Sequence, residues 1–157
     1  MTGATRLRRP VRRRLPLIIA AVALFLGLSV LVARYLSTET DERSAVISLV
    51  RAEARGDAGG MLDQLDGCRA DPACRAQTQR NAARLRRPGD VKVLAYQSDS
   101  AYALGAASGL TRIAWGIIDR GLPVVQCVRV RREGNALTGR RVILQRLSAP
   151  IGRESTC

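Results

Sequence analysis

The sequence has 157 residues and no histidine, and its only lysine is Lys92. The absence of histidine excludes Ser-His-Asp triads, Cys-His pairs and histidine-ligated metal sites. Any general base would have to be a carboxylate, a tyrosine, a cysteine or that single lysine. We therefore expect a protein that is not an enzyme, with no catalytic residue, no metal and no cofactor.

Aromatic residues are also scarce, at 3% of the chain. Beyond the N-terminal apolar segment and its flank only Tyr96, Tyr102 and Trp115 remain, which are too few to form a stacking platform for bases. The formal net charge of +13 therefore does not indicate nucleic-acid binding. The glycine-rich stretch from Gly56 to Gly60 lacks the Lys-Ser/Thr ending of a phosphate-binding loop.

What the sequence does contain is one long uncharged run, Leu15–Ala33, of 19 residues. As a helix it would extend roughly 28 Å, close to the hydrocarbon thickness of a bilayer. Six arginines and no acidic residue precede it, whereas several acids follow Arg34. By the positive-inside rule, the sequence predicts a basic cytoplasmic tail at 1–14, a transmembrane helix at 15–36, an exported domain at 37–151 and a C-terminal tail at 152–157.

Two other interpretations of the apolar run remain open. A signal peptide could be cleaved after Ser29, with Gly27 at the −3 position, although the run is long for one. A helix buried in a soluble protein is the other alternative. An uncleaved anchor would make this a single-pass plasma-membrane protein of bacterial-envelope type, with its C-terminal domain outside.

Helical signals follow the apolar run. Residues Ser37 to Thr40 offer N-caps for a helix that extends to about Arg55 and is ended by Gly56. A short second helix follows, and Asp71-Pro72 begins a third, polar helix. The positions expected to face the core are Val46, Leu49, Val50 and Ala54 in the first of these helices and Met61, Leu62 and Leu65 in the second.

After Gly89 the periodicity becomes that of β-strands. Helices followed by consecutive strands with short loops indicate an α+β fold, in which two to three helices pack on a curved antiparallel sheet of four to five strands. Turn signals occur at Ser98-Asp99-Ser100, Ala107-Ser108-Gly109, Arg120-Gly121 and Gly134-Asn135. The expected strands are residues 91–98, 101–105, 110–118, 122–133 and 140–151.

This order of elements resembles the nuclear transport factor 2-like superfamily of cone-shaped, cystatin-like α+β domains. The most telling stretch is RAEARGDAGGMLDQL, residues 51–65, where many such domains have a helix, a Gly-Asp break and a short second helix. The superfamily includes ketosteroid isomerases and dehydratases, and also non-catalytic domains that are tethered to membranes. Its isomerase-like members hold an acid and a hydrogen-bond donor over an apolar pocket.

No residue signature of those catalytic members occurs here. The candidates Tyr96, Asp99, Tyr102 and Asp119 are sufficiently explained by turn and hairpin roles. The resemblance therefore implies the non-catalytic, membrane-anchored type. Trp115 is expected in the core, or with Tyr96 and Tyr102 in the wall of a pocket for an apolar small molecule.

The four cysteines, Cys68, Cys74, Cys127 and Cys157, fit an oxidising compartment. Three pairings are open. We prefer Cys68 with Cys74, which would staple the start of the third helix, and Cys127 with Cys157, which would pin the C-terminal tail to the sheet. Free buried thiols are the alternative, and the leading one if the domain is cytoplasmic. Zinc and redox sites are disfavoured because the C-x2-C spacing is missing.

Positive charge in the exported part is segregated. Residues 72–89 carry five arginines and no acid, and residues 120–157 carry eight arginines and two acids. Such runs are usually a solvated face, but they can also dock onto anionic headgroups or an acidic partner. The residues concerned are Arg80, Arg84 and Arg87, which at i, i+4 and i+7 share a helix face, and Arg129, Arg131, Arg140 and Arg141 of the last hairpin.

Together these features predict a membrane-anchored domain that acts in protein interaction or envelope assembly, by self-association or with another envelope protein. Binding of an apolar small molecule, as a transport accessory, is the alternative. An isomerase-like activity is the third interpretation.

Overall fold

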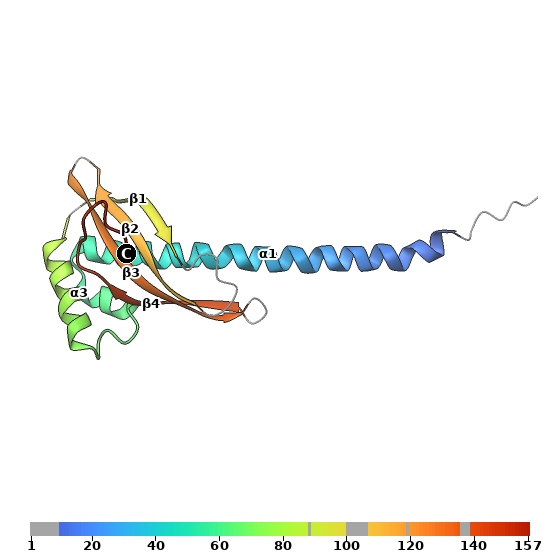
Figure 1. Ribbon diagram of the computed structural model, residues 1–157, viewed down its shortest axis with the longest axis horizontal. Coiled ribbons are helices and arrows are strands. Elements are labelled where there is room, and N and C mark those ends of the chain that lie inside the picture. The colour runs from blue at the N-terminus through green and yellow to red at the C-terminus, as the bar shows by residue number, and fades with distance from the viewer. Residues whose placement is uncertain (1–9, 88, 100–106, 119, 136–138) are drawn as a thin grey trace, which may run out of the picture.

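The computed structural model describes residues 10–87, 89–99, 107–118, 120–135 and 139–157 (Figure 1). Within these ranges the chain forms an α+β domain, as predicted, from which one helix projects far outward. The helices are α1 (Pro10–Arg55), α2 (Ala58–Gln64) and α3 (Pro72–Arg84), and the strands are β1 (Val91–Ser98), β2 (Ala107–Ile117), β3 (Arg120–Asn135) and β4 (Gly139–Leu147).

A single uninterrupted helix joins the apolar segment to the domain. The predicted break at Ser37 to Thr40 is wrong, because α1 runs through it for 46 residues in all, about 69 Å. Serine and threonine cap a helix only where the chain before them is not helical. With helical residues on both sides and no glycine or proline between, they remain within the helix. α1 ends before Gly56, whose φ of 76° disfavours other residues.

Both short helices begin after an aspartate, which acts as the N-cap. The carboxylate of Asp57 accepts a hydrogen bond from the N–H of Gly60 at 2.8 Å. The carboxylate of Asp71 accepts from the N–H groups of Ala73 and Cys74 at 2.9 and 3.2 Å. The predicted Asp-Pro start of the third helix is thereby confirmed.

The four strands form an open antiparallel sheet in the order β1-β2-β3-β4. Each neighbouring pair contains one register shift, and such bulges increase the twist of a sheet. Figure 1 shows the strands crossing over the C-terminal part of α1. The described residues thus contain four strands, the lower of the two predicted numbers.

The predicted strand boundaries hold for β1 but not for the other strands. β2 begins at Ala107, because Ala107 to Gly109 pair with β3 instead of forming a turn. β3 likewise continues through Gly134 and Asn135. β4 ends at Leu147, and the predicted strand at 101–105 lies outside the described residues.

The core lies between the C-terminal part of α1 and the inner face of the sheet. Burial of each large apolar side chain contributes about 1.5–3 kcal/mol, so this part of α1 is firmly fixed in the domain. The predicted positions Val46, Leu49, Val50, Ala54, Met61, Leu62 and Leu65 are all buried, together with Ile113, Trp115, Val124, Val128, Val130, Leu144 and Leu147 of the sheet.

Candidate functional site

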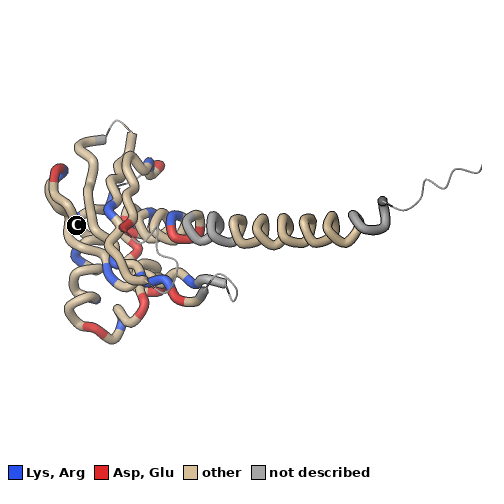
Figure 2. Tube along the Cα trace, turned by 45° about the vertical axis from the view of Figure 1, so that its right-hand side comes forward, with Lys and Arg blue, Asp and Glu red and all other residues tan. Residues whose placement is uncertain are grey.

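The apolar segment Leu15–Ala33 is solvent-exposed along its whole length. Leu17 and Phe25, for example, are 71% and 68% exposed. Figure 2 shows this part of α1 as a rod without charged residues. The segment is long and apolar enough to span a membrane, with a mean hydropathy of 2.8. Soluble monomers rarely expose so large an apolar surface, which suggests membrane anchoring.

Both preferred disulfides are present in the structure. Cys68 is bonded to Cys74, with a Cα–Cα distance of 5.2 Å, and Cys127 to Cys157, with 5.7 Å. All four cysteines lie in described parts of the chain, so none is left as a free thiol. Two disulfides in one small domain point to an oxidising compartment.

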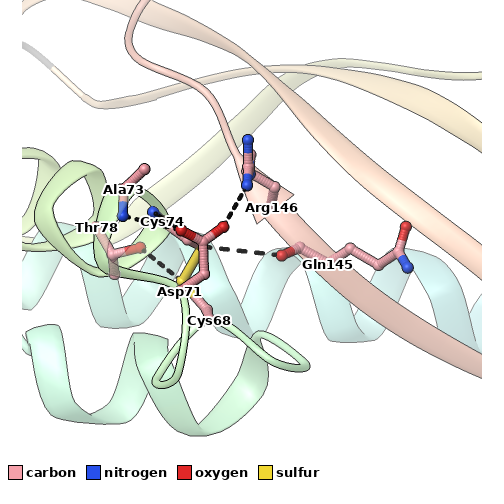
Figure 3. A network of polar contacts seen from close by, with 7 residues as sticks. All are labelled: Cys68, Asp71, Ala73, Cys74, Thr78, Gln145 and Arg146. Carbon is pink, nitrogen blue, oxygen red and sulfur yellow. Dashed lines mark hydrogen bonds and ion pairs between the residues drawn. A yellow bond between two sulfur atoms is a disulfide. The ribbon is translucent and has the colours of Figure 1, made fainter.

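The Cys68–Cys74 disulfide lies in a polar network that fixes α3 to β4 (Figure 3). The carboxylate that caps α3, Asp71, also accepts from the guanidinium of Arg146 in β4 at 2.5 Å. Hydrogen bonding from the N–H of Cys74, aided by Arg146, holds the pKa of Asp71 below its usual value. The Thr78 hydroxyl donates to Sγ of Cys68 at 3.5 Å, since a disulfide sulfur carries no proton.

The Cys127–Cys157 disulfide holds the C-terminal tail against the sheet. The N–H of Ile151 donates to the carbonyl of Val125 at 2.8 Å. The Arg112 guanidinium donates to the carbonyl of Ser155 at 3.0 Å, and also to that of Arg153. The disulfide completes this attachment at the last residue, so the predicted pinning of the tail is confirmed.

Glu42 lies where α1 enters the domain, and its side chain is fully buried. Its Oε1 accepts hydrogen bonds from the hydroxyls of Tyr96, Ser98 and Thr111 at 2.9, 2.7 and 2.7 Å. Its Oε2 accepts from Nε of Arg132 at 2.8 Å, and that arginine is 1% exposed. One carboxylate of α1 is therefore bonded to β1, β2 and β3.

The hydrogen bonds decide the protonation state of Glu42. Burial would raise its pKa, but the bonds from Thr111, Ser98, Arg132 and Tyr96 outweigh burial and lower it. The group is thus an ionised carboxylate with both oxygens engaged. Burial and the charge of Glu42 raise the pKa of Tyr96, which keeps its hydroxyl a donor. The hydrogen bond between Tyr96 and the Glu42 carboxylate is therefore explained by its role in holding α1 to the sheet.

Glu53, three turns further along the same face of α1, is buried differently. Its Oε1 accepts from Nε2 of Gln126 at 2.8 Å, but no group among the described residues hydrogen-bonds its Oε2. The Gln126 side chain in turn accepts from the indole N–H of Trp115 at 2.9 Å. Burial raises the pKa of Glu53 to about 7, despite hydrogen bonds to Gln126 and Asn81. Near neutral pH this carboxyl is partly protonated.

Of the three predicted pocket residues, Trp115 and Tyr96 lie within the described parts of the chain. Trp115 is 0% exposed and lies in the core, and the Tyr96 hydroxyl is bonded to Glu42. Tyr102 and Asp119 lie outside the described residues. The N–H of Asp99 donates to the carbonyl of Leu110 at 3.3 Å, as suits a turn.

Three clefts are lined by described residues, and their volumes are about 490, 310 and 350 Å³. None of these three includes Trp115 or Tyr96. The largest lies beside the Cys68–Cys74 loop and combines the acids Asp66 and Asp71 with Arg129 and Arg146. Its mixed charge is unlike the apolar lining that binds most small organic ligands.

The arginines of the third helix lie at the end of the domain farthest from the apolar segment (Figure 1). Arg80 and Arg84 are exposed on α3. The prediction that Arg87 shares their helix face is wrong, because α3 ends at Arg84. Its guanidinium instead donates to the carbonyl of Leu122 at 2.9 Å, and its N–H to that of Ala54 at 2.8 Å.

Arg131 and Arg141 of the last hairpin lie toward the other end, whereas Arg129 lines the cleft beside the Cys68–Cys74 loop. Arg129, Arg131 and Arg141 are exposed, and Arg131 forms an ion pair with Glu133. Arg140 pairs with Gly134 in the strand register, and its side chain lies outside the described residues. Figure 1 shows this hairpin extending along α1 toward the apolar segment. The two predicted basic surfaces therefore face in different directions.

Sequence reasoning missed three buried charged residues, Glu42, Glu53 and Arg132. The signal for the two acids is their spacing from Val46 and Val50, which places both on the apolar stripe of the helix. A buried acid needs a partner. The signal for Arg132 is weaker. Strand alternation places Arg132 inward with Val128 and Val130, but this holds only if the strand extends as far as residue 132. The same alternation places Gln126 inward with Val128, and Thr111 inward with Ile113.

Comparisons with protein-family models, with curated proteins and with solved structures found no match to this chain. The resemblance to the nuclear transport factor 2-like superfamily stays a prediction.

Proposed function

We propose that this chain is a single-pass envelope protein whose C-terminal domain acts outside the cytoplasm in protein interaction or assembly. The observation that carries the proposal is the continuity of α1. One helix contains both an exposed apolar segment, Leu15–Ala33, and the buried face that begins at Glu42 and extends to Ala54. The domain is thereby attached to its anchor by a rigid rod instead of a flexible linker.

The length of that rod sets the place of the domain. Glu42 lies nine positions after Ala33, about 14 Å further along the helix. The headgroup layer on each side of a bilayer is about 5–8 Å thick. The domain would therefore lie just beyond the headgroups, with the hairpin that bears Arg131 and Arg141 turned toward them. Anionic lipid would favour that arrangement.

Two independent features support an orientation with the domain outside. Residues 1–14 carry six arginines and no acid, the charge asymmetry that retains an N-terminal tail in the cytoplasm. The domain at the other end of the helix contains two disulfides, which persist outside the cytoplasm.

The interior of the domain supports a non-catalytic role. The ionised Glu42 is enclosed by four donors, and Trp115 is completely buried. Helices that precede a curved, open antiparallel sheet also support membership of the non-catalytic, nuclear transport factor 2-like type.

Protease digestion of intact cells that carry an N-terminal tag tests the proposal. We expect external protease to remove the domain and to leave a protected fragment with the tag and residues of the apolar segment. A matched variant, with the six arginines at 6, 8, 9, 12, 13 and 14 changed to Gln, should show a mixture of orientations. A domain that is fully protected until the membrane is permeabilised would contradict the orientation.

Purification in mild detergent tests the assembly role. We expect the full chain to migrate in a complex larger than its monomer, or to retain another envelope protein. Recovery of monomer alone, from membranes in which the domain is confirmed to be outside, would contradict that role while leaving the topology intact.

A further inference from the structure

Five arginines gather at the end of the domain farthest from the apolar segment. Arg55 is the last residue of α1, Arg80 and Arg84 belong to α3, and Arg86 and Arg87 follow it. The segment that follows α3 lies beside the end of α1, because the N–H of Arg87 donates to the carbonyl of Ala54 at 2.8 Å. The aliphatic stem of Arg86 also lies against Gly56. We call these five residues the far cluster.

The far cluster is not neutralised within the described parts of the chain. Arg55, Arg80, Arg84 and Arg86 are exposed, and none of the ion pairs found among the described residues involves a member of the cluster. Arg80 donates to the amide oxygen of Gln77 at 2.8 Å, which leaves its charge uncompensated. By contrast, Arg69, Arg131 and Arg146 elsewhere on the surface each pair with an acid.

Helix polarity accounts for only part of this arrangement. The C-termini of α1 and α3 favour a nearby cation, which explains one arginine at each helix end. Five arginines that form no ion pair with any described residue exceed what two helix ends need. Their mutual repulsion is a cost that an anionic partner would relieve.

Exposed apolar side chains lie beside the far cluster. Leu122 is 67% exposed, and its carbonyl accepts the guanidinium of Arg87 at 2.9 Å. Ile118, the residue that directly follows β2, is 60% exposed. Arginine beside large apolar side chains, with lysine absent, is the composition that protein–protein interfaces favour.

We propose that the far cluster, with Leu122 and Ile118, is the docking surface for a protein partner that presents carboxylates around an apolar patch. The charge of the cluster requires the carboxylates, and the two exposed apolar residues require the patch. The proposal rests on the proposed function in one respect: the anchor points this surface away from the membrane, so the partner would approach from the opposite side.

Peptide binding to the full chain in phosphatidylcholine nanodiscs tests this surface. The probes are two fluorescent peptides, one an acidic helix with leucines along one face, the other identical except for serines at those positions. We expect the leucine peptide to bind more tightly. Arg80→Gln with Arg84→Gln should weaken its binding about fivefold, as expected for loss of two exposed charge pairs. Leu122→Ser should weaken the leucine peptide and leave the serine peptide unchanged.

The matched control is Arg129→Gln with Arg131→Gln, which removes the same charge from the hairpin and should change binding less than twofold. Equal binding of the two peptides, or an equal effect of the control, would overturn the proposal. Capture of phosphatidylglycerol vesicles through Arg80 and Arg84, without peptide binding, would also overturn it and indicate an opposing membrane. Nanodiscs expose both sides, so failure here is independent of the orientation measured in cells.

Discussion

The carboxylate of Glu42 and the guanidinium of Arg132 form a buried ion pair between residues 90 positions apart in the sequence. The pair joins the N-terminal end of the buried part of α1 to the third strand of the sheet. Because both side chains are almost completely enclosed, neither charge is compensated by water. The relation between the long helix and the sheet therefore depends on this contact.

Removal of the arginine should be strongly destabilising. Arg132→Met leaves the Glu42 carboxylate buried without its cation, a change that typically costs about 3–5 kcal/mol. Urea unfolding of the full chain in detergent measures the loss. The double variant Glu42→Gln with Arg132→Met should recover part of it, because no charge then remains buried. A loss below about 1 kcal/mol in the single variant would show that the pair is not stabilised as described.

The buried carboxyl of Glu53 should make stability depend on pH in the direction opposite to a surface acid. Its pKa is about 7 in the folded chain and near 4.5 when unfolded. The contribution of Glu53 to the free energy of unfolding is therefore fully present below about pH 4.5. It falls as the pH rises toward 7 and is lost above that. The expected loss is about 3 kcal/mol, at about 1.4 kcal/mol for each pKa unit.

The variant Glu53→Gln isolates this effect because its side chain does not titrate. We expect the free energy of unfolding of the variant, relative to the natural chain, to rise between about pH 5 and pH 7 and to level off above pH 7. Chemical unfolding at several pH values measures that difference. The amide in place of Oε2 has its own cost, but that cost is the same at every pH. A difference that stays constant across the range would contradict the raised pKa.

The two disulfides should differ in what they contribute. Removal of the disulfide that closes the longer loop, by Cys127→Ser with Cys157→Ser, should lower the free energy of unfolding by about 4 kcal/mol. Removal of the disulfide that closes the shorter loop, by Cys68→Ser with Cys74→Ser, should lower it by about 2 kcal/mol. The reason is that a longer closed loop restricts the unfolded chain more. Chemical unfolding of the two variants, each with its remaining disulfide oxidised, measures both free energies of unfolding for comparison. A larger loss from the shorter loop would point to its network with Asp71 and Thr78 as the greater contribution.

Membrane insertion should tolerate one charge in the apolar segment but not two. Its twelve Leu, Ile, Val and Phe residues favour insertion by about 0.3–0.6 kcal/mol each, and a central arginine opposes it by about 2.5–3.5 kcal/mol. Leu24→Arg alone should stay resistant to carbonate extraction, and Leu24→Arg with Leu28→Arg should not. The control Leu24→Ala with Leu28→Ala should behave like the natural chain. Extraction of that control would contradict a transmembrane segment.

The features predicted correctly from the sequence are those that local rules decide. The buried stripe that contains Val46 and Leu49 follows from helical periodicity, the start of α3 from Asp71-Pro72, and β1 from strand alternation. The disulfide pairing was predicted from what each bond would hold in place. All of these depend on residues close in sequence or on simple topology.

The features that were missed depend on contacts between distant segments. Ser37 to Thr40 look like caps in isolation, and only helix on both sides keeps them helical. Ala107 to Gly109 look like a turn, and only pairing with the long strand β3 makes them extended. The partners of Glu42 come from three strands, and no local pattern indicates which hydroxyls and which arginine will surround it.

The unbroken α1 also fixes an angle. Each residue of an α-helix turns the chain by about 100° and advances it by about 1.5 Å. Each face of the apolar segment therefore has a fixed angular relation to one side of the domain. One residue inserted between Ala33 and Thr40 would swing the domain by more than a quarter turn, whereas seven residues, close to two full turns, would raise it by about 10 Å with nearly the same heading. The number of residues between the apolar segment and the domain therefore sets the rotation of the domain about the helix axis as well as its distance from that segment.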